Sequence, residues 1–151
     1  MTVNGLPLHP LVVHAAVVFV PLAGLLALAY PVPRWRGWLR WPVLLVSILA
    51  AVLVWFAATT GSSLEHSATV RSGMLASPAL ARAIHRHEDL AGKLQASTWV
   101  LAVLAAGTWW FHPRRGWIRT LLVPLLAVCG AVALVLVVLT GDAGARAVWS
   151  T

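Results

Sequence analysis

The chain has 151 residues, of which 60% are hydrophobic and 10% are charged. A soluble domain carries about 25% charged residues, so this composition excludes an ordinary water-soluble protein. The formal net charge is +7, from 11 Lys and Arg against 4 Asp and Glu. Because the basic residues lie in short connections between apolar runs, they indicate membrane topology and argue against nucleic-acid binding.

Four apolar runs predict four transmembrane helices in a single domain over residues 1–151. The predicted spans cover about 8–30, 41–61, 87–111 and 120–141, the third with an amphipathic lead-in from 78. Each run approaches or exceeds the roughly 17–20 residues that cross a hydrocarbon core. We expect Ser77 to cap the third helix, with Pro78 in its first turn. The predicted fold is an all-α, integral membrane four-helix bundle with up-down-up-down connections.

Four spans place both termini on one side of the membrane, opposite the connections at 31–40 and 111–119. The only charged residues in these two connections are arginines, at Arg34, Arg36, Arg40, Arg114, Arg115 and Arg119. Tryptophans typical of an interfacial belt gather at the same edge, at Trp35, Trp38, Trp41, Trp109, Trp110 and Trp117. The positive-inside rule makes this side cytoplasmic, so we expect extracytoplasmic termini.

The two arginine-rich connections resemble each other. One reads Pro33-Arg-Trp-Arg-Gly-Trp-Leu-Arg40 and the other reads Pro113-Arg-Arg-Gly-Trp-Ile-Arg119. Each following span contains an early proline and ends in Thr-Gly. The pattern predicts a duplicated helical hairpin about an axis along the membrane normal. The alternative is convergence, because cytoplasmic connections commonly contain Arg and Trp. A duplication would make His9 and His87 near-equivalent positions.

Histidines are concentrated toward the extracytoplasmic side, and only His112 lies at the cytoplasmic edge; the others are His9, His14, His66, His85 and His87. At 1.5 Å per helical residue, His9 and His87 lie at about 31 and 35 Å from that edge. His66 and Asp142 reach a similar level, whereas His14 lies deeper, at about 24 Å. Ionisable residues at such positions are candidates for a functional site. The expected site is therefore the extracytoplasmic mouth of the bundle.

Helical spacing separates two of these histidines. His87 shares an inward-facing stripe with five other residues, Leu80, Ile84, Ala91, Leu94 and Thr98. His85 falls about 200° away, on the charged face of the same helix. We therefore expect His87 to point into the bundle and His85 to point away from it.

Imidazole is a common ligand of haem iron and of transition metals. The candidate axial ligands of haem b are His14, His87 and His9, and the choice between His9 and His14 stays open. As an alternative to haem, a copper, zinc or iron ion has candidate ligands in His9, His14, His87, His66 and Asp142. A third interpretation is that no cofactor binds, and that the histidines cap helices and bond to backbone groups.

The opening Gly5-Leu-Pro-Leu-His-Pro-Leu-Val-Val-His14 resembles the start of a bacterial membrane family, domain of unknown function 2231. That family has four spans and a histidine near the start of the third, which His87 matches. The resemblance implies a bacterial cytoplasmic (inner) membrane protein in which His14 and His87 are the preferred ligands. The family's terminal histidine is missing here, and Ala15 and Ala16 replace its usual Phe-Pro. Some similar proteins carry a fused Rieske domain, which implies membrane redox chemistry.

The sequence therefore favours a haem- or metal-binding membrane protein with a redox or electron-transfer role. Its expected partners are the bilayer, a membrane redox partner and further copies of the chain. A cofactor-free structural or partner-binding subunit is the second interpretation. Transport of protons or a small solute is less favoured because no acidic residue lies mid-membrane. A hydrolase is not expected, because adjacency in sequence gives no triad geometry to Ser62, Ser63, Glu65 and His66. Whether the chain is an enzyme of another class stays open, with no enzyme activity the favoured interpretation.

Overall fold

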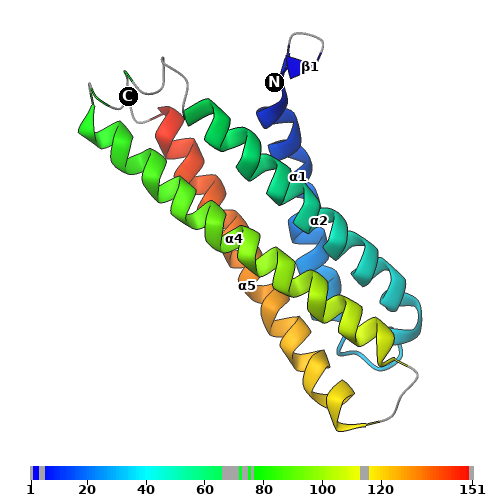
Figure 1. Ribbon diagram of the computed structural model, residues 1–151. Coiled ribbons are helices and arrows are strands. Elements are labelled where there is room, and N and C mark those ends of the chain that lie inside the picture. The colour runs from blue at the N-terminus through cyan, green and yellow to red at the C-terminus, as the bar shows by residue number, and fades with distance from the viewer. Residues whose placement is uncertain are drawn as a thin grey trace.

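The computed structural model describes residues 2–3, 6–65, 72, 75, 77–112 and 116–149, with side chains omitted at 2–10, 62–65 and 147–149. Four long helices form the fold: α1 (Leu8–Ala29), α2 (Arg36–Glu65), α4 (Pro78–Trp110) and α5 (Trp117–Trp149) (Figure 1). All four are long and apolar enough to cross a membrane. Two short strands, β1 (Thr2–Val3) and β2 (Leu6–Pro7), pair antiparallel before α1. The predicted all-α membrane bundle is confirmed.

The helices run up, down, up and down, so both termini lie at the same end of the bundle (Figure 1). α1 packs against α2 and α5, and α4 packs against the same two helices. α1 therefore lies diagonally across from α4, and α2 from α5. A two-fold axis along the bundle would exchange each diagonal pair. The arrangement is thus compatible with a duplicated hairpin, which stays a prediction from the sequence.

Two helices extend beyond the spans that the apolar pattern marks. α2 begins at Arg36 rather than near residue 41, and α5 covers Trp117–Trp149 rather than about 120–141. Apolar residues mark only the stretch inside hydrocarbon, whereas backbone hydrogen bonds continue into the interface, where Arg and Trp side chains still reach water. α4 begins at Pro78 as expected, and the Ser77 Oγ accepts a hydrogen bond from the Leu80 N–H at 3.3 Å.

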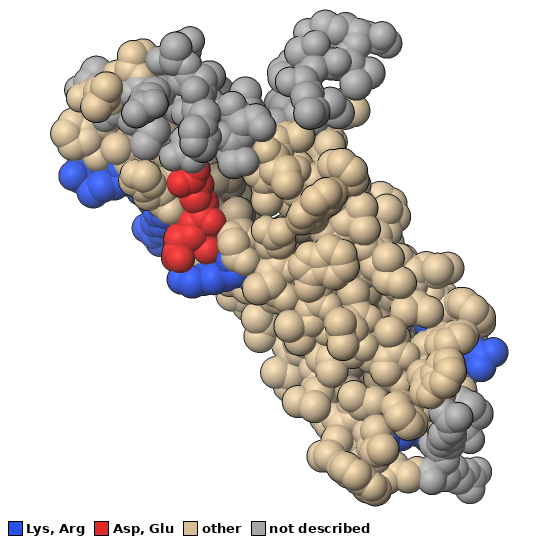
Figure 2. All heavy atoms as spheres, in the orientation of Figure 1, with Lys and Arg blue, Asp and Glu red and all other residues tan. Residues whose placement is uncertain are grey.

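The outward surface between the two ends of the bundle is apolar. The most exposed side chains there include Leu11, Val18, Val103, Val128 and Val138, each of which is 61–69% exposed. Charged atoms lie toward the two ends of the face drawn in Figure 2, with an uncharged band between them. A contiguous apolar surface of this kind would drive aggregation in water. A lipid bilayer is the environment that accommodates it.

The backbones of α1 and α5 approach each other closely at two glycines. A Cβ at Gly130 would lie 2.8 Å from the Cβ of Ala27 and 2.9 Å from the carbonyl oxygen of Gly24. A Cβ at Gly24 would in turn lie 2.9 Å from the carbonyl oxygen of Gly130. Helices in lipid associate mainly through close packing, and small residues permit it. These two glycines therefore fix the spacing between α1 and α5.

We expect Gly130→Ala to lower the thermal-unfolding midpoint of the protein in mild detergent by several degrees. The added methyl group has no room, and overpacking of this kind costs about 1–3 kcal/mol. Gly141→Ala on the same helix is the matched control, because a Cβ there meets nothing within 4 Å. Thermal circular dichroism of both variants measures the effect. Equal midpoints for the two variants would contradict the close contact between α1 and α5.

Candidate functional site

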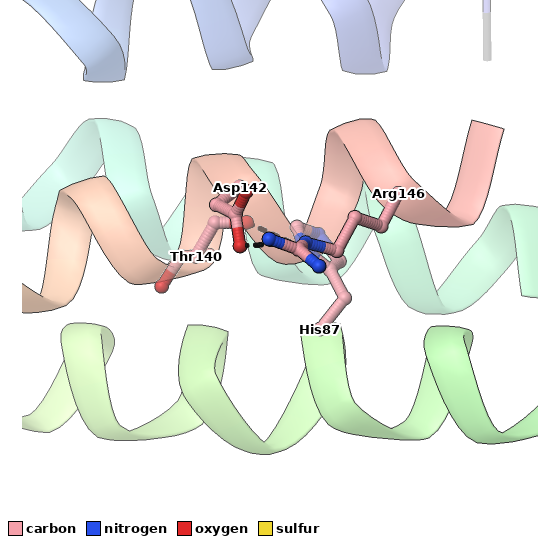
Figure 3. Close-up of polar contacts among 4 residues, drawn as sticks. All are labelled: His87, Thr140, Asp142 and Arg146. Atoms are coloured by element: carbon pink, nitrogen blue, oxygen red, sulfur yellow. Dashed lines mark hydrogen bonds and ion pairs between the residues drawn. The ribbon is translucent and has the colours of Figure 1, made fainter. Parts of the chain in front are cut away.

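His87 projects from α4 onto α5 (Figure 3). The first half of α4, which carries His87, lies at the end of the bundle that carries the termini (Figure 1). The Nδ1 of His87 lies 3.0 Å from the backbone carbonyl oxygen of Thr140. A carbonyl oxygen can only accept a hydrogen bond, so Nδ1 must carry the hydrogen. In the neutral ring the lone pair is then on Nε2. The backbone of α5 thus selects one tautomer of His87 and orients the ring.

Gly144 provides the space for this ring. A Cβ at Gly144 would lie 3.1 Å from both Nδ1 and Cε1 of His87. Gly144 follows Thr140 by four residues, about one helical turn, so the ring spans a single turn of α5. The Thr140 hydroxyl donates to the carbonyl oxygen of Leu136 at 2.7 Å. Thr140 therefore contacts His87 through its backbone carbonyl, in a position that depends on helix geometry and on the absence of a side chain at Gly144.

The predicted inward stripe on α4 is confirmed. Leu94 and Thr98 are buried, and the other members of the stripe are half-buried: Leu80, Ile84, His87 and Ala91. His85 points the other way, with 63% of its side chain exposed and its Nδ1 3.4 Å from Glu88 Oε2. The two histidines therefore occupy different environments although only one residue separates them.

Asp142 lies on α5 close to this site, where it has a basic partner. Arg146 Nε donates to Asp142 Oδ2 at 2.9 Å, and both side chains are exposed (Figure 3). Asp89 on α4 is paired in the same way with Lys93, at 2.6 Å. A metal ion at Asp142 would have to compete with the guanidinium of Arg146.

His14 is exposed on α1, on the same helix face as Leu11, Val18 and Leu25. That face is the outer surface of the bundle, and α1 lies diagonally across from α4. Among the side chains that the structure describes, no three His, Cys, Asp or Glu gather closely enough to hold a metal ion. The structure therefore does not bring His14, His87 and Asp142 into one metal site. The side chain of His9 and all of His66 lie outside the described residues.

A second polar cluster lies at the opposite, arginine-rich end. The hydroxyl of Tyr30 lies 3.2 Å from Nδ1 of His112, which joins the connection after α1 to the connection after α4. Tyr30 is only 1% exposed, and its hydroxyl also hydrogen-bonds to Thr108. Sequence reasoning missed this contact because its partners are 82 residues apart and each resembles an ordinary interfacial residue.

Burial disfavours the charged form of both members of this second cluster, and nearby arginines add to the effect on His112. Desolvation by burial raises the pKa of Tyr30 above its ordinary value. Desolvation lowers the pKa of His112, and the positive charges of Arg40, Arg119 and Arg36 lower that pKa further. Both effects on His112 disfavour the imidazolium form. Tyr30 and His112 therefore interact as neutral groups at neutral pH.

Two arginines of this end bind the carbonyl groups that the helix ends leave without partners. Arg36 Nε donates to the carbonyl oxygen of Tyr30 at 3.2 Å, just after α1. Arg119 Nη1 donates to the carbonyl oxygen of His112 at 3.3 Å, just after α4. A positive charge at a helix C-terminus also interacts favourably with the helix dipole. Each hairpin thus has an arginine bonded to a carbonyl oxygen just after its first helix.

We expect nitrogen-15 NMR of histidine-labelled protein to show His87 as the tautomer with hydrogen on Nδ1. Gly144→Ala should change both ring nitrogen shifts, because the new methyl group displaces the ring from α5. Gly92→Ala on α4 is the matched control, since a Cβ there meets nothing within 4 Å. Hydrogen on Nε2 in the unmodified protein would contradict the contact with Thr140.

Comparison with known proteins identifies the family of the chain. Neither the curated proteins nor the solved structures gave a significant match. A family model described as "Predicted membrane protein (DUF2231)" matches residues 5–151, which include the opening His-Pro motif and all four helices. The family description states membrane location and no activity. The chain therefore belongs to the DUF2231 family of predicted membrane proteins.

Proposed function

We propose that the protein binds haem b or a transition-metal ion through His87 and has a redox role in the bacterial inner membrane. The observation that carries the proposal is the hydrogen bond between His87 Nδ1 and the carbonyl oxygen of Thr140. Histidines that bind metals usually donate the hydrogen of their other ring nitrogen to a carbonyl or carboxylate. The α5 backbone thus prepares Nε2 of His87 as a ligand before anything binds.

His87 is suited to be one ligand of the haem iron. For the second ligand, the structure of α1 favours His9 over His14. His14 faces the outer surface of the bundle with Leu11 and Val18, away from the interior side of α4. Position 9 instead lies seven residues, or about two turns, before the buried Ala16, so the two positions share one face of α1. Position 9 also lies near the predicted level of His87, at about 31 against 35 Å. We therefore propose that His87 and His9 would hold the haem iron.

A haem or copper ion would supply a one-electron carrier at the extracytoplasmic mouth. The chain's own contribution is orientation and environment: Thr140 fixes the ring of His87, and Gly144 keeps the ring close to α5. For a metal ion in place of haem, His66 and Asp142 are further candidate ligands, and Asp142 would first have to leave Arg146. A membrane redox partner would deliver or receive the electron at this mouth.

A second proposal is a cofactor-free structural or partner-binding subunit, because the His87–Thr140 contact has a structural explanation of its own. That bond joins α4 to α5 and satisfies a half-buried imidazole nitrogen. Under this proposal Nε2 of His87 meets water or lipid headgroups at the mouth. The two proposals differ in one measurable property, which is the visible absorption of the purified protein.

We expect the protein, expressed with a supply of haem and purified in mild detergent, to show a Soret band and, when reduced, an α band. His87→Ala should abolish these bands, and His9→Ala should weaken them or shift them. His85→Ala is the matched control, because His85 lies on the exposed face of the same helix. For a metal ion, elemental analysis should find a stoichiometric metal that His87→Ala removes. Absence of both bands and metal in the unmodified protein would exclude the redox proposal and support the structural one.

A further inference from the structure

Four arginines at one end of the bundle have no ion pair with a carboxylate in the part of the chain that the structure describes: Arg34, Arg36, Arg40 and Arg119. The chain contains only four acidic residues, at Glu65, Glu88, Asp89 and Asp142. Glu65 ends α2, which begins with Arg36, and a helix of 30 residues is about 45 Å long. The other three acidic residues lie in the half of α4 or α5 that is nearer the termini. These four acidic side chains therefore do not supply a counter-charge at the arginine-rich end.

Three of these arginines converge, and we name Arg36, Arg40 and Arg119 the arginine cluster. Arg36 and Arg40 lie about one turn apart on α2. Arg36 and Arg119 bond to the carbonyl oxygens of Tyr30 and His112, whose side chains lie 3.2 Å apart. The positive charges of all three arginines lower the pKa of His112, which agrees with this arrangement. Carbonyl groups already hold Arg36 and Arg119 in place. Arg40 is different: it is half-buried, and within the described part of the chain its buried Nε has no hydrogen-bond partner. A buried guanidinium N–H without an acceptor is costly, and an anion at this position would satisfy it.

The place of the cluster in the membrane indicates which anion is available. The rings of Trp41 and Trp109 pack edge to face, with centroids 5.0 Å apart, on neighbouring helices at this end. Trp38 and Trp110 are 63% and 58% exposed there. Tryptophans of this kind lie at the level of lipid headgroups. The guanidinium fork matches the geometry of phosphate oxygens better than any other common side chain does.

We propose that the arginine cluster binds a phosphate group, supplied by an anionic lipid headgroup or by a soluble phosphate. Protein atoms cover Nε of Arg40 in this structure, so the side chain turns outward to donate its Nε–H and a terminal N–H to two phosphate oxygens. Arg36 and Arg119 contribute positive charge from their anchored positions. The bound anion also opposes the electrostatic effect of the arginines on His112. Binding therefore raises the pKa of His112, whose neighbour Tyr30 lies 3.2 Å away.

The test uses the full-length protein in mild detergent, titrated separately with phosphatidylglycerol, phosphatidylcholine and inorganic phosphate. Native mass spectrometry counts the bound lipid, and NMR follows the titration of His112. We expect phosphatidylglycerol to bind and to raise the His112 midpoint, and phosphatidylcholine to do neither. Arg40→Gln should weaken binding by about tenfold, as expected when one charged hydrogen-bonding group is removed. Saturation by inorganic phosphate with no competition from phosphatidylglycerol would assign the site to a soluble phosphate.

Arg34→Gln is the matched control. It removes the same charge from the same end of the bundle, but Arg34 precedes α2, is exposed and lies over the Trp35 ring, 5.3 Å from its centroid. Arg40→Lys keeps the positive charge but removes the forked guanidinium group, so it serves as the test variant if Arg40→Gln fails to fold. We expect the Arg40→Lys protein to bind phosphatidylglycerol less tightly than the unmodified protein. Equal loss in the Arg34 and Arg40 variants would show a general surface field and overturn the proposal. So would unchanged binding in both, or an unchanged His112 midpoint at saturating lipid and phosphate.

Discussion

Inside a bilayer each backbone N–H and C=O must find its partner within the protein, and this requirement shapes the whole molecule. The four apolar segments satisfy it as helices. Hydroxyl side chains on these helices bond to carbonyl groups of their own helix, as Thr98 does to Gln95 and Thr108 to Ala105, each at 2.9 Å. Ser47 is buried without a partner among the described residues. Most charged side chains lie toward the two ends, and Lys93, near the middle of α4, is paired with Asp89 on the same helix.

The two ends are chemically different. At the end with the termini, acidic and basic side chains pair with each other, as Asp142 does with Arg146. His87 is held there by a backbone carbonyl of α5 in a defined tautomer. At the other end arginines predominate, and the polar contacts are between neutral groups such as Tyr30 and His112. One end is thus suited to present a histidine nitrogen, and the other to attract an anion.

The features that could be predicted from the sequence are those that depend on the periodicity and composition of one segment. The four helices, the Ser77 cap and the inward stripe of α4 all follow from patterns within a single segment. Contacts between segments were not predictable, because helical spacing gives a facing direction but no partner. The position of Thr140 opposite His87 is one example. The only available signal was Gly144, a glycine within a helix on the facing segment, and its meaning depends on the ring that lies against it.

The height of a histidine along the bundle and the helix face on which it lies are independent properties. His14 was preferred by family resemblance, yet it lies on the outer face of α1. The sequence already separated His9 from His14 by roughly 140° around the helix, so the two could not share one partner in a regular helix. The close approach of Gly24 to Gly130 was also missed, because a glycine in an apolar run does not reveal which helix it meets.

We propose that the two ends face different compartments, with the arginine cluster in the cytoplasm and His87 outside. Reporter fusions in a bacterial host test it most directly. A C-terminal fusion to alkaline phosphatase should be active, and the same fusion to green fluorescent protein should be dark. Fusions made after Gly116, in the connection between α4 and α5, should give the reverse pattern. Fluorescence at the C-terminus together with phosphatase activity after Gly116 would contradict the claim.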